Sequence, residues 1–224
     1  MLIPPRSLQV RVRTVAVIGT DPVDSHDVDL DTRCDSNGIP FVPKNRISAR
    51  LRDAALTVLV GPDGGLEAVE TAIALFGAAK ATTSEGRLVH VGAAVWPEFA
   101  AHRVDAVLDA AARKYGRRAV LRRAITQALT VELGQTAIDD SGTPISGSLR
   151  FARGIRPGVV LRAPLRWQRT PTEAEVRFLA KTVLALRQIG HGASDSRGQV
   201  TCSLDGDFAA TVALGYPNEV PADA

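Results

Sequence analysis

Acidic residues are missing from a long stretch of this chain. Between Ser141 and Thr172 there is no aspartate or glutamate, although the whole chain has 24 of them against 27 lysines and arginines. The same stretch carries six arginines, namely Arg150, Arg153, Arg156, Arg162, Arg166 and Arg169. A second basic cluster occupies residues 113–123. Solvated surfaces normally mix both signs of charge, so such single-sign stretches predict a polyanionic partner.

Cysteines and long apolar runs are scarce as well. Cys34 and Cys202 are the two cysteines, and they fit no metal or redox spacing. No run of about 18 apolar residues could span a bilayer, and the N-terminal MLIPPRSLQV lacks the apolar core of a signal peptide. We therefore expect no membrane partner and a reducing, cytoplasmic setting.

Length and periodicity predict one α+β domain. A chain of 224 residues, 45% of them hydrophobic, can bury a sizeable core, so we expect a single domain over 1–224 with a helical insertion at about 98–130. The predicted order is a strand in 7–19, helices at 45–60 and 66–76, a strand in 86–96, helical pieces in 103–128, a hairpin at 147–167, a helix capped by Thr170 that ends at Gly190, and a final strand. This order suits a ferredoxin-like (RRM-like) sandwich.

The segment DSNGIPFVPKNRISARLRDA, residues 35–54, joins a rigid turn to a basic helix. We expect Asn45 to cap that helix. A helix start offers unpaired backbone N–H groups and the positive end of the helix dipole, which together suit a phosphate. Lys44, Arg46 and Arg50 would oppose the dipole at this end, and a bound phosphate would offset that cost.

Three spaced aspartates precede this turn. In an extended chain Asp27, Asp29 and Asp31 point to one side, where carboxylates can hold Mg²⁺ or orient an attacking 2′-hydroxyl. A calcium loop is excluded because Thr32 stands at the sixth position, where glycine is needed, and no closing glutamate follows. His26 and His191 offer another chemistry, general acid–base cleavage of RNA.

Four stretches of the chain, in the right order over residues 8–204, together resemble the RAMP superfamily of CRISPR proteins. DLDTRCDSNGIPFVPKNRISARLRDA resembles its acidic loop followed by an Ile-Pro-Gly-Ser-Ser-Leu-Lys-Gly-like turn and helix. LFGAAKATTSEGRLVHVGAAV resembles its Phe-Gly and Gly-Arg-Leu stretch, and AIDDSGTPISGSLRFARGIRPGVVLRAPL its aspartate-containing hairpin. LALRQIGHGASDSRGQV resembles its closing helix and glycine-rich loop.

The chain also departs from the family pattern. Lys44, Asn45 and Arg46 replace the family's Gly-Ser-Ser, and Ser48 stands at its lysine position, whereas its arginine is kept as Arg52. In the glycine-rich loop the last Gly-Arg is replaced by Gln199. We expect the substituted Lys44 and Arg46 to supply phosphate contacts in a specialised subunit.

The resemblance implies a backbone-type (Cas seven-like) subunit of a type III-like effector ribonucleoprotein in antiviral defence. Its partners would be guide RNA, target RNA, other effector subunits and copies of itself. Counting from the turn, the family's catalytic aspartate falls on Asp29, or on Asp27 with a small shift, and Asp29 would act with Mg²⁺ or Mn²⁺. The residues expected to bind RNA are Lys44, Asn45, Arg46, Arg50, Arg52, Arg11, Arg13, Gly190, Gly192, Arg197 and Gly198.

Other functions remain open from the sequence alone. The chain could be a non-catalytic scaffold, or a guide-RNA-processing endoribonuclease that uses His191 or His26. A ferredoxin-like domain that binds a small molecule is a further alternative, but it leaves the acid-free stretch unexplained.

Overall fold

A four-stranded antiparallel sheet forms the body of the protein in its computed structural model, in the order β2-β5-β1-β6. The described residues are 3–19, 28–62, 64–77, 86–116, 118–136, 139, 141–143, 145–190 and 196–217. The strands are β1 (Ser7–Val12), β2 (Val89–Val91), β3 (Thr130–Gln135), β4 (Arg150–Ile155), β5 (Val160–Trp167) and β6 (Val200–Leu204). The helices are α1 (Lys44–Val60), α2 (Leu66–Phe76), α3 (Glu98–Tyr115), α4 (Arg118–Leu129), α5 (Glu173–Ala185) and α6 (Phe208–Gly215). The predicted α+β class is confirmed.

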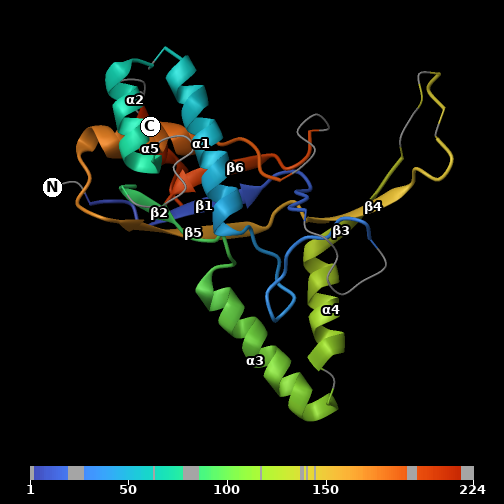
Figure 1. The fold of residues 1–224 in the computed structure, drawn as a ribbon. Helices are drawn as coiled ribbons and strands as arrows, with labels where there is room; N and C mark the ends of the chain where they lie inside the picture. The colour runs from blue at the N-terminus through green and yellow to red at the C-terminus, as the bar shows by residue number, and fades with distance from the viewer. Residues whose placement is uncertain are drawn as a thin grey trace.

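Helices α1, α2 and α5 lie on one side of the sheet (Figure 1). The strand predicted in 7–19 is confirmed by β1, whose Leu8, Val10 and Val12 are all 0% exposed and belong to the core. From the helices, Leu51 of α1 and Leu179 of α5 are equally buried in this core. Alternate residues of a strand point to opposite faces, so the second face of the sheet is left to polar side chains.

The segment between β2 and β5 stands outside this sheet. Helices α3 and α4 extend away on the side opposite α1, α2 and α5 (Figure 1). They correspond to the helical pieces predicted within the insertion at about 98–130. Strands β3 and β4 follow α4 and pair with each other in a separate two-stranded sheet.

The predicted hairpin at 147–167 is wrong. Strand β4 pairs with β3, whereas β5 pairs with β1 and β2. The turn at Pro157 and Gly158 therefore passes the chain from one sheet to the other. Backbone hydrogen bonds between Val12 and residues 158 and 159, at 2.8 and 2.9 Å, hold that turn against the end of β1.

Two predicted helix caps are shifted along the chain. Helix α1 begins one residue earlier, with Pro43 at its N-cap, and the amide oxygen of Asn45 accepts from the N–H of Arg46 at 3.0 Å. Helix α5 uses the second of two overlapping Thr-x-x-Glu matches: Thr172 and Glu175 form the capping box instead of Thr170 and Glu173. A guanidinium on Arg169 also binds Glu175, which explains the choice.

Candidate nucleic-acid interface

The N-terminal end of α1 is basic and uncapped. No side chain makes a capping hydrogen bond there, and its first turn contains no acidic residue. Lys44, Asn45 and Arg46 are exposed. Because the first N–H groups of a helix lack partners within it and carry the positive end of the dipole, this end is suited to bind an anion.

Two arginines of α1 join this helix end to the two loops beside it. A guanidinium N–H of Arg50 donates to the carbonyl oxygen of Gly190 at 2.6 Å, and one of Arg46 donates to the carbonyl oxygen of Gly19 at 3.4 Å. Arg50 also lies 3.4 Å from a carboxylate oxygen of Asp53. Each guanidinium has five donors, so both arginines keep N–H groups that can bind a phosphate.

The structure thus places Gly190, at the start of the predicted glycine loop, next to α1. Gly190 and Gly198 have φ of +79° and +68°. A Cβ at Gly190 would lie 2.3 Å from the carbonyl oxygen of Val17, and a Cβ at Gly198 would lie 1.9 Å from that of Ile189. Close packing of the loop within the protein accounts for these two glycines. Arg197 lies between them in sequence, and its carbonyl oxygen accepts from the Gln188 side chain at 2.6 Å. Gly192 and His191 lie outside the described residues.

The remaining predicted RNA-binding arginines lie elsewhere. Arg11 and Arg13 are exposed on the face of the sheet away from α1, α2 and α5, and Arg13 donates to the hydroxyl of Thr201 at 2.9 Å. Arg52 is half-buried on α1 and makes no hydrogen bond or ion pair with a described residue.

Asp29 is exposed and is held by β4. Its backbone N–H donates to the carbonyl oxygen of Phe151 at 2.8 Å, and its side-chain Oδ2 accepts from the Phe151 N–H at 2.7 Å. The second carboxylate oxygen has no partner among the described residues. Asp27 and His26 lie outside the described residues.

Among the described residues of this loop, Asp29 is the exposed carboxylate that a metal ion could bind. Among the described residues no three His, Cys, Asp or Glu side chains gather into a ligand cluster. Mg²⁺ commonly keeps several waters and binds through one or two carboxylates plus substrate phosphates. Asp29 suits that mode, and the described residues do not form a preformed protein cage.

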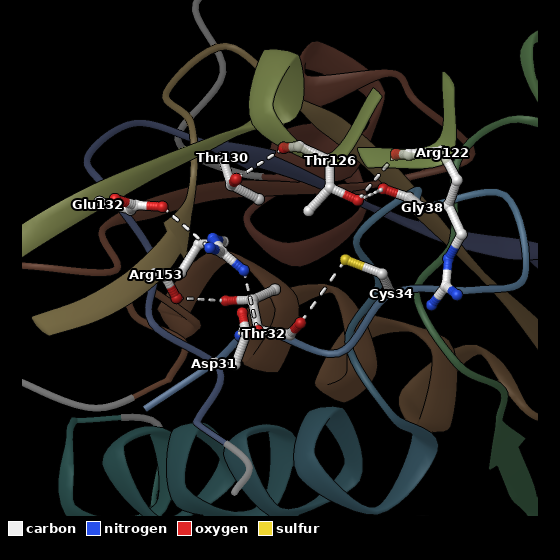
Figure 2. Close-up of polar contacts among 9 residues, drawn as sticks. All are labelled: Asp31, Thr32, Cys34, Gly38, Arg122, Thr126, Thr130, Glu132 and Arg153. Atoms are coloured by element: carbon white, nitrogen blue, oxygen red, sulfur yellow. Dashed lines mark hydrogen bonds and ion pairs between the residues drawn. The ribbon is translucent and has the colours of Figure 1, made fainter. Parts of the chain in front are cut away.

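Asp31 has a different task, since it anchors the acidic loop to the β3–β4 sheet. The buried guanidinium of Arg153 donates to Asp31 and to Glu132, each at 2.9 Å (Figure 2). Burial disfavours the charged guanidinium, but the hydrogen bonds and attraction from Glu132 and Asp31 outweigh it and raise the pKa of Arg153. The Thr32 hydroxyl also donates to the carbonyl oxygen of Arg153 at 2.6 Å.

The same loop is fastened to the helices of the insertion. The Thr126 hydroxyl of α4 donates to the carbonyl oxygen of Gly38 at 2.9 Å (Figure 2), and the Asn37 amide donates to Asp105 of α3 at 2.8 Å. The acidic loop therefore connects helices α3 and α4 with the body, a role that the sequence analysis missed.

The same loop contains Cys34. Burial raises the pKa of its thiol to about 11, so the thiol stays protonated at neutral pH.

The arginines of the acid-free stretch divide into engaged and available side chains. Arg153 is held by Asp31 and Glu132, Arg169 by Glu175, and Arg156 donates to the carbonyl oxygen of Thr130 at 2.9 Å. Arg162 and Arg166 are exposed on β5, on the face predicted for them. Neither makes a side-chain hydrogen bond or ion pair with a described residue.

Within the described part of the chain, no helix combines the length and the apolar character needed to cross a membrane.

Known proteins that are similar to this chain are found by its structure and not by its sequence. No family model matches it, and no curated protein matches it in sequence. A chain of the type III-B Cmr-beta complex bound to cognate target RNA aligns with a TM-score of 0.63 at 10% identity, covering 89% of this chain and 96% of that one. A chain of Cmr-beta in its apo state aligns with a TM-score of 0.61 at 11% identity, covering 91% and 98%.

Oligomeric Cmr4 from Pyrococcus furiosus aligns with a TM-score of 0.51 at 11% identity, covering 91% of this chain and 98% of that one. At sequence identities this low, the similarity shows a shared fold and nothing further. The fold of this chain is that of subunits of type III-B Cmr complexes over nearly its whole length, which agrees with the RAMP resemblance of its sequence motifs.

Proposed function

We propose that this chain is a guide-RNA-binding subunit of a type III-like CRISPR effector ribonucleoprotein. The observation that carries the proposal is the uncapped N-terminal end of α1, where Arg46 and Arg50 join the helix to Gly19 and Gly190. A phosphate at this point would meet backbone N–H groups, the dipole and two guanidinium groups at once.

The fold supports the same proposal. The four strands of the main sheet and the helices that cover it follow along the chain as β1, α1, α2, β2, β5, α5 and β6, and the order across the sheet is β2-β5-β1-β6. Apart from the additional helix α2, this is a βαββαβ order. A βαββαβ sequence of elements is that of the ferredoxin-like fold, with α3, α4, β3 and β4 inserted between its second and third strands. Proteins with this fold include RNA-binding modules whose sheet carries the contacts.

The partners follow from the proposal. The structures with a matching fold belong to Cmr complexes, one of them bound to target RNA and another oligomeric. By analogy, copies of this chain and other effector subunits would stack along one guide. Purified with its guide, the protein should then sediment as a multi-subunit particle, and a strict monomer under those conditions would contradict the assembly.

Charge reversal at the α1 site tests the RNA contact. The double variant Arg46→Glu and Arg50→Glu should weaken binding to all single-stranded RNA sequences alike, because phosphate contacts carry no base information. A matched control is Arg177→Glu with Lys181→Glu, which makes the same change in net charge on α5. If both double variants weaken RNA binding equally, the effect comes from net charge alone, and that result would contradict a site at α1.

A second candidate function is cleavage of guide-paired target RNA at Asp29. The specific observation in its favour is that Asp29 is exposed and that the Phe151 N–H fixes Oδ2, while Oδ1 has no partner among the described residues. That oxygen could orient an attacking 2′-hydroxyl. Mg²⁺ or Mn²⁺, when held by Asp29 and RNA phosphates, would stabilise charge on the reacting phosphate.

The variant Asp29→Asn separates this candidate from the alternatives. It should lower the cleavage rate on the order of 10² to 10⁴ and leave RNA affinity nearly unchanged, whereas Glu70→Gln, at an exposed position of α2, should affect neither. Cleavage that resists EDTA, acts on the guide precursor and disappears on changing His191 or His26 would favour the processing enzyme. Absence of any cleavage by the assembled wild-type particle would leave a non-catalytic scaffold.

A further inference from the structure

The face of the sheet away from α1, α2 and α5 carries a row of arginines. The β1–β5 register places Gln9 opposite Arg162 and Arg11 opposite Val160, and Arg166 lies opposite His90 of β2. The outward positions of these strands are occupied by Ser7, Gln9, Arg11, His90, Val160, Arg162, Pro164, Arg166, Thr201 and Ser203. No acidic side chain is among them.

The positive charge of this row is not neutralised by its described surroundings. Arg11, Arg162 and Arg166 are exposed, and none of the three makes a side-chain hydrogen bond or ion pair with a described residue. Asp205 lies in the turn after β6, but its carboxylate accepts from the backbone N–H groups of Arg6 and Ser7 at 2.8 to 3.2 Å. That carboxylate is therefore already used in holding the turn.

The row leads toward the α1 site. In the β1–β5 register Arg166, Arg162, Arg11 and Arg13 succeed one another along the sheet, over about 26 Å at the rise of a strand. Beyond Arg13, the carbonyl oxygen of Val15 accepts from the Gly198 N–H at 2.8 Å. The chain then reaches Gly19, which Arg46 contacts. The chain from Thr14 to Gly19, which carries no basic side chain, thus links the open face to Gly198 and to α1.

The composition of this face favours a phosphate backbone over a protein or a stacked base. Its outward strand positions contain no phenylalanine, tyrosine or tryptophan, so they offer no platform on which bases could stack. Val160, Pro164 and the exposed Val95, which pairs with Arg162, are the apolar residues here, too few for the apolar core that protein interfaces have. Exposed guanidinium groups in a row suit phosphates spaced along a strand.

We propose that this open face is a second phosphate-binding surface, over which single-stranded RNA continues from the α1 site. The inference rests on the proposed RNA-binding function and adds the path of the strand and Arg162 and Arg166 as its contacts. Binding there would be independent of base sequence, because every contact is made to phosphate.

The test compares RNA length and salt dependence in three proteins: wild type, Arg162→Glu with Arg166→Glu, and Arg46→Glu with Arg50→Glu. Homopolymeric RNAs of increasing length serve as probes. The wild type should bind long RNA more tightly than short RNA. The Arg162/Arg166 variant should bind short RNA like the wild type and should lose the gain with length.

The salt dependence of RNA binding provides a quantitative test. Losing two phosphate contacts should reduce the slope of log K against log salt by roughly 1.4, so between 50 and 200 mM salt the variant should lose about sevenfold less affinity than the wild type. Both arginines are exposed, and an unchanged thermal unfolding midpoint will show that the fold is intact.

The possible failures are distinct. If the wild type binds RNA and the Arg46/Arg50 variant does not, but the Arg162/Arg166 variant matches the wild type at every length, the second surface is overturned and the α1 site stands. That result would leave the open face to an acidic protein partner. If the wild type binds no RNA at low salt, the proposed function and this inference both fail.

Discussion

Arg153 and Arg162 belong to the same acid-free stretch, yet the fold gives them opposite surroundings. The Arg153 side chain is 11% exposed and binds Asp31 and Glu132, which come from other parts of the chain. Arg162 is exposed on β5 and has no partner among the described residues. A stretch without acidic residues therefore does not mean unpaired arginines, because the partners of a side chain are chosen by tertiary structure.

This difference has a functional meaning. The buried ion pair of Arg153 holds the acidic loop to the β3–β4 sheet, so this arginine cannot also neutralise a phosphate. Arg150 on β4 and Arg162 and Arg166 on β5 are the exposed arginines of the stretch that make no pair with a described residue, and the last two share one face of their strand. We therefore propose that Arg162 and Arg166 serve polyanion binding.

The largest expected effect is on stability, at Arg153. Replacing Arg153 with methionine should lower the free energy of unfolding by about 3 kcal/mol, because it leaves Asp31, whose side chain is 15% exposed, without its partner. Urea denaturation measures the loss. Arg153→Lys keeps the charge but cannot bind both carboxylates with one planar guanidinium, so its free energy of unfolding should lie between those of the wild type and Arg153→Met. A loss below about 0.5 kcal/mol would show that the ion pair does not anchor the loop.

Arg169 is intermediate between the two extremes. Its side chain is 55% exposed, but it binds Glu175, which is 9% exposed and caps α5. Glu175→Gln should cost about 1 kcal/mol, because it removes the charge that binds Arg169, whereas the amide oxygen can still accept from the Thr172 N–H. Glu173→Gln is the matched control on the same helix: Glu173 makes an exposed pair with Arg177, which is worth a few tenths of a kcal/mol.

The pH dependence of the Glu175 variant follows from its surroundings. The hydrogen bond from Arg169, together with those from Thr172, lowers the pKa of Glu175 despite its burial. The stabilisation by the ionised carboxylate is therefore complete above the unfolded pKa, about 4.3, and is lost as the pH falls through the lower folded value. The difference in unfolding free energy between wild type and Glu175→Gln should shrink in acid, and a difference that grows there would contradict the assignment.

The smallest expected effect on stability is at Arg162. Arg162→Ala removes an exposed side chain that makes no pair with a described residue, so the free energy of unfolding should change by no more than about 0.5 kcal/mol. Urea denaturation beside Arg153→Met gives the comparison directly. A loss at Arg162 as large as that at Arg153 would show that the open face is engaged within the protein and is not available to RNA.

Local patterns in the sequence predicted the parts of this fold that depend on near neighbours. The strand in 7–19 and the helix before Gly190 are predicted from short-range signals, and β1 and α5 confirm both. Both N-caps were misplaced by two residues, because Pro43 can precede a helix and because residues 170–175 contain two overlapping capping matches.

The long-range features could not be predicted in this way. Arg153 and Asp31 are 122 positions apart, and their pairing depends on how β4 lies beside the acidic loop. The contact of Arg50 with Gly190 spans 140 positions, so the sequence predicted both groups as RNA-binding without predicting that they touch. The turn at Pro157 and Gly158 has the local signature of a hairpin, and only the competing partners β1 and β3 show that it links two sheets.

The salt dependence of single-stranded RNA binding tests the central claim most directly. For the wild type, log K should fall linearly with log salt, with a slope of about −0.7 for each phosphate contacted. The double variant Arg46→Glu and Arg50→Glu should have a slope smaller by roughly 1.4, and Arg177→Glu with Lys181→Glu should keep the wild-type slope. A wild-type affinity that does not change with salt, or a slope that is the same in all three proteins, would contradict phosphate binding at the N-terminal end of α1.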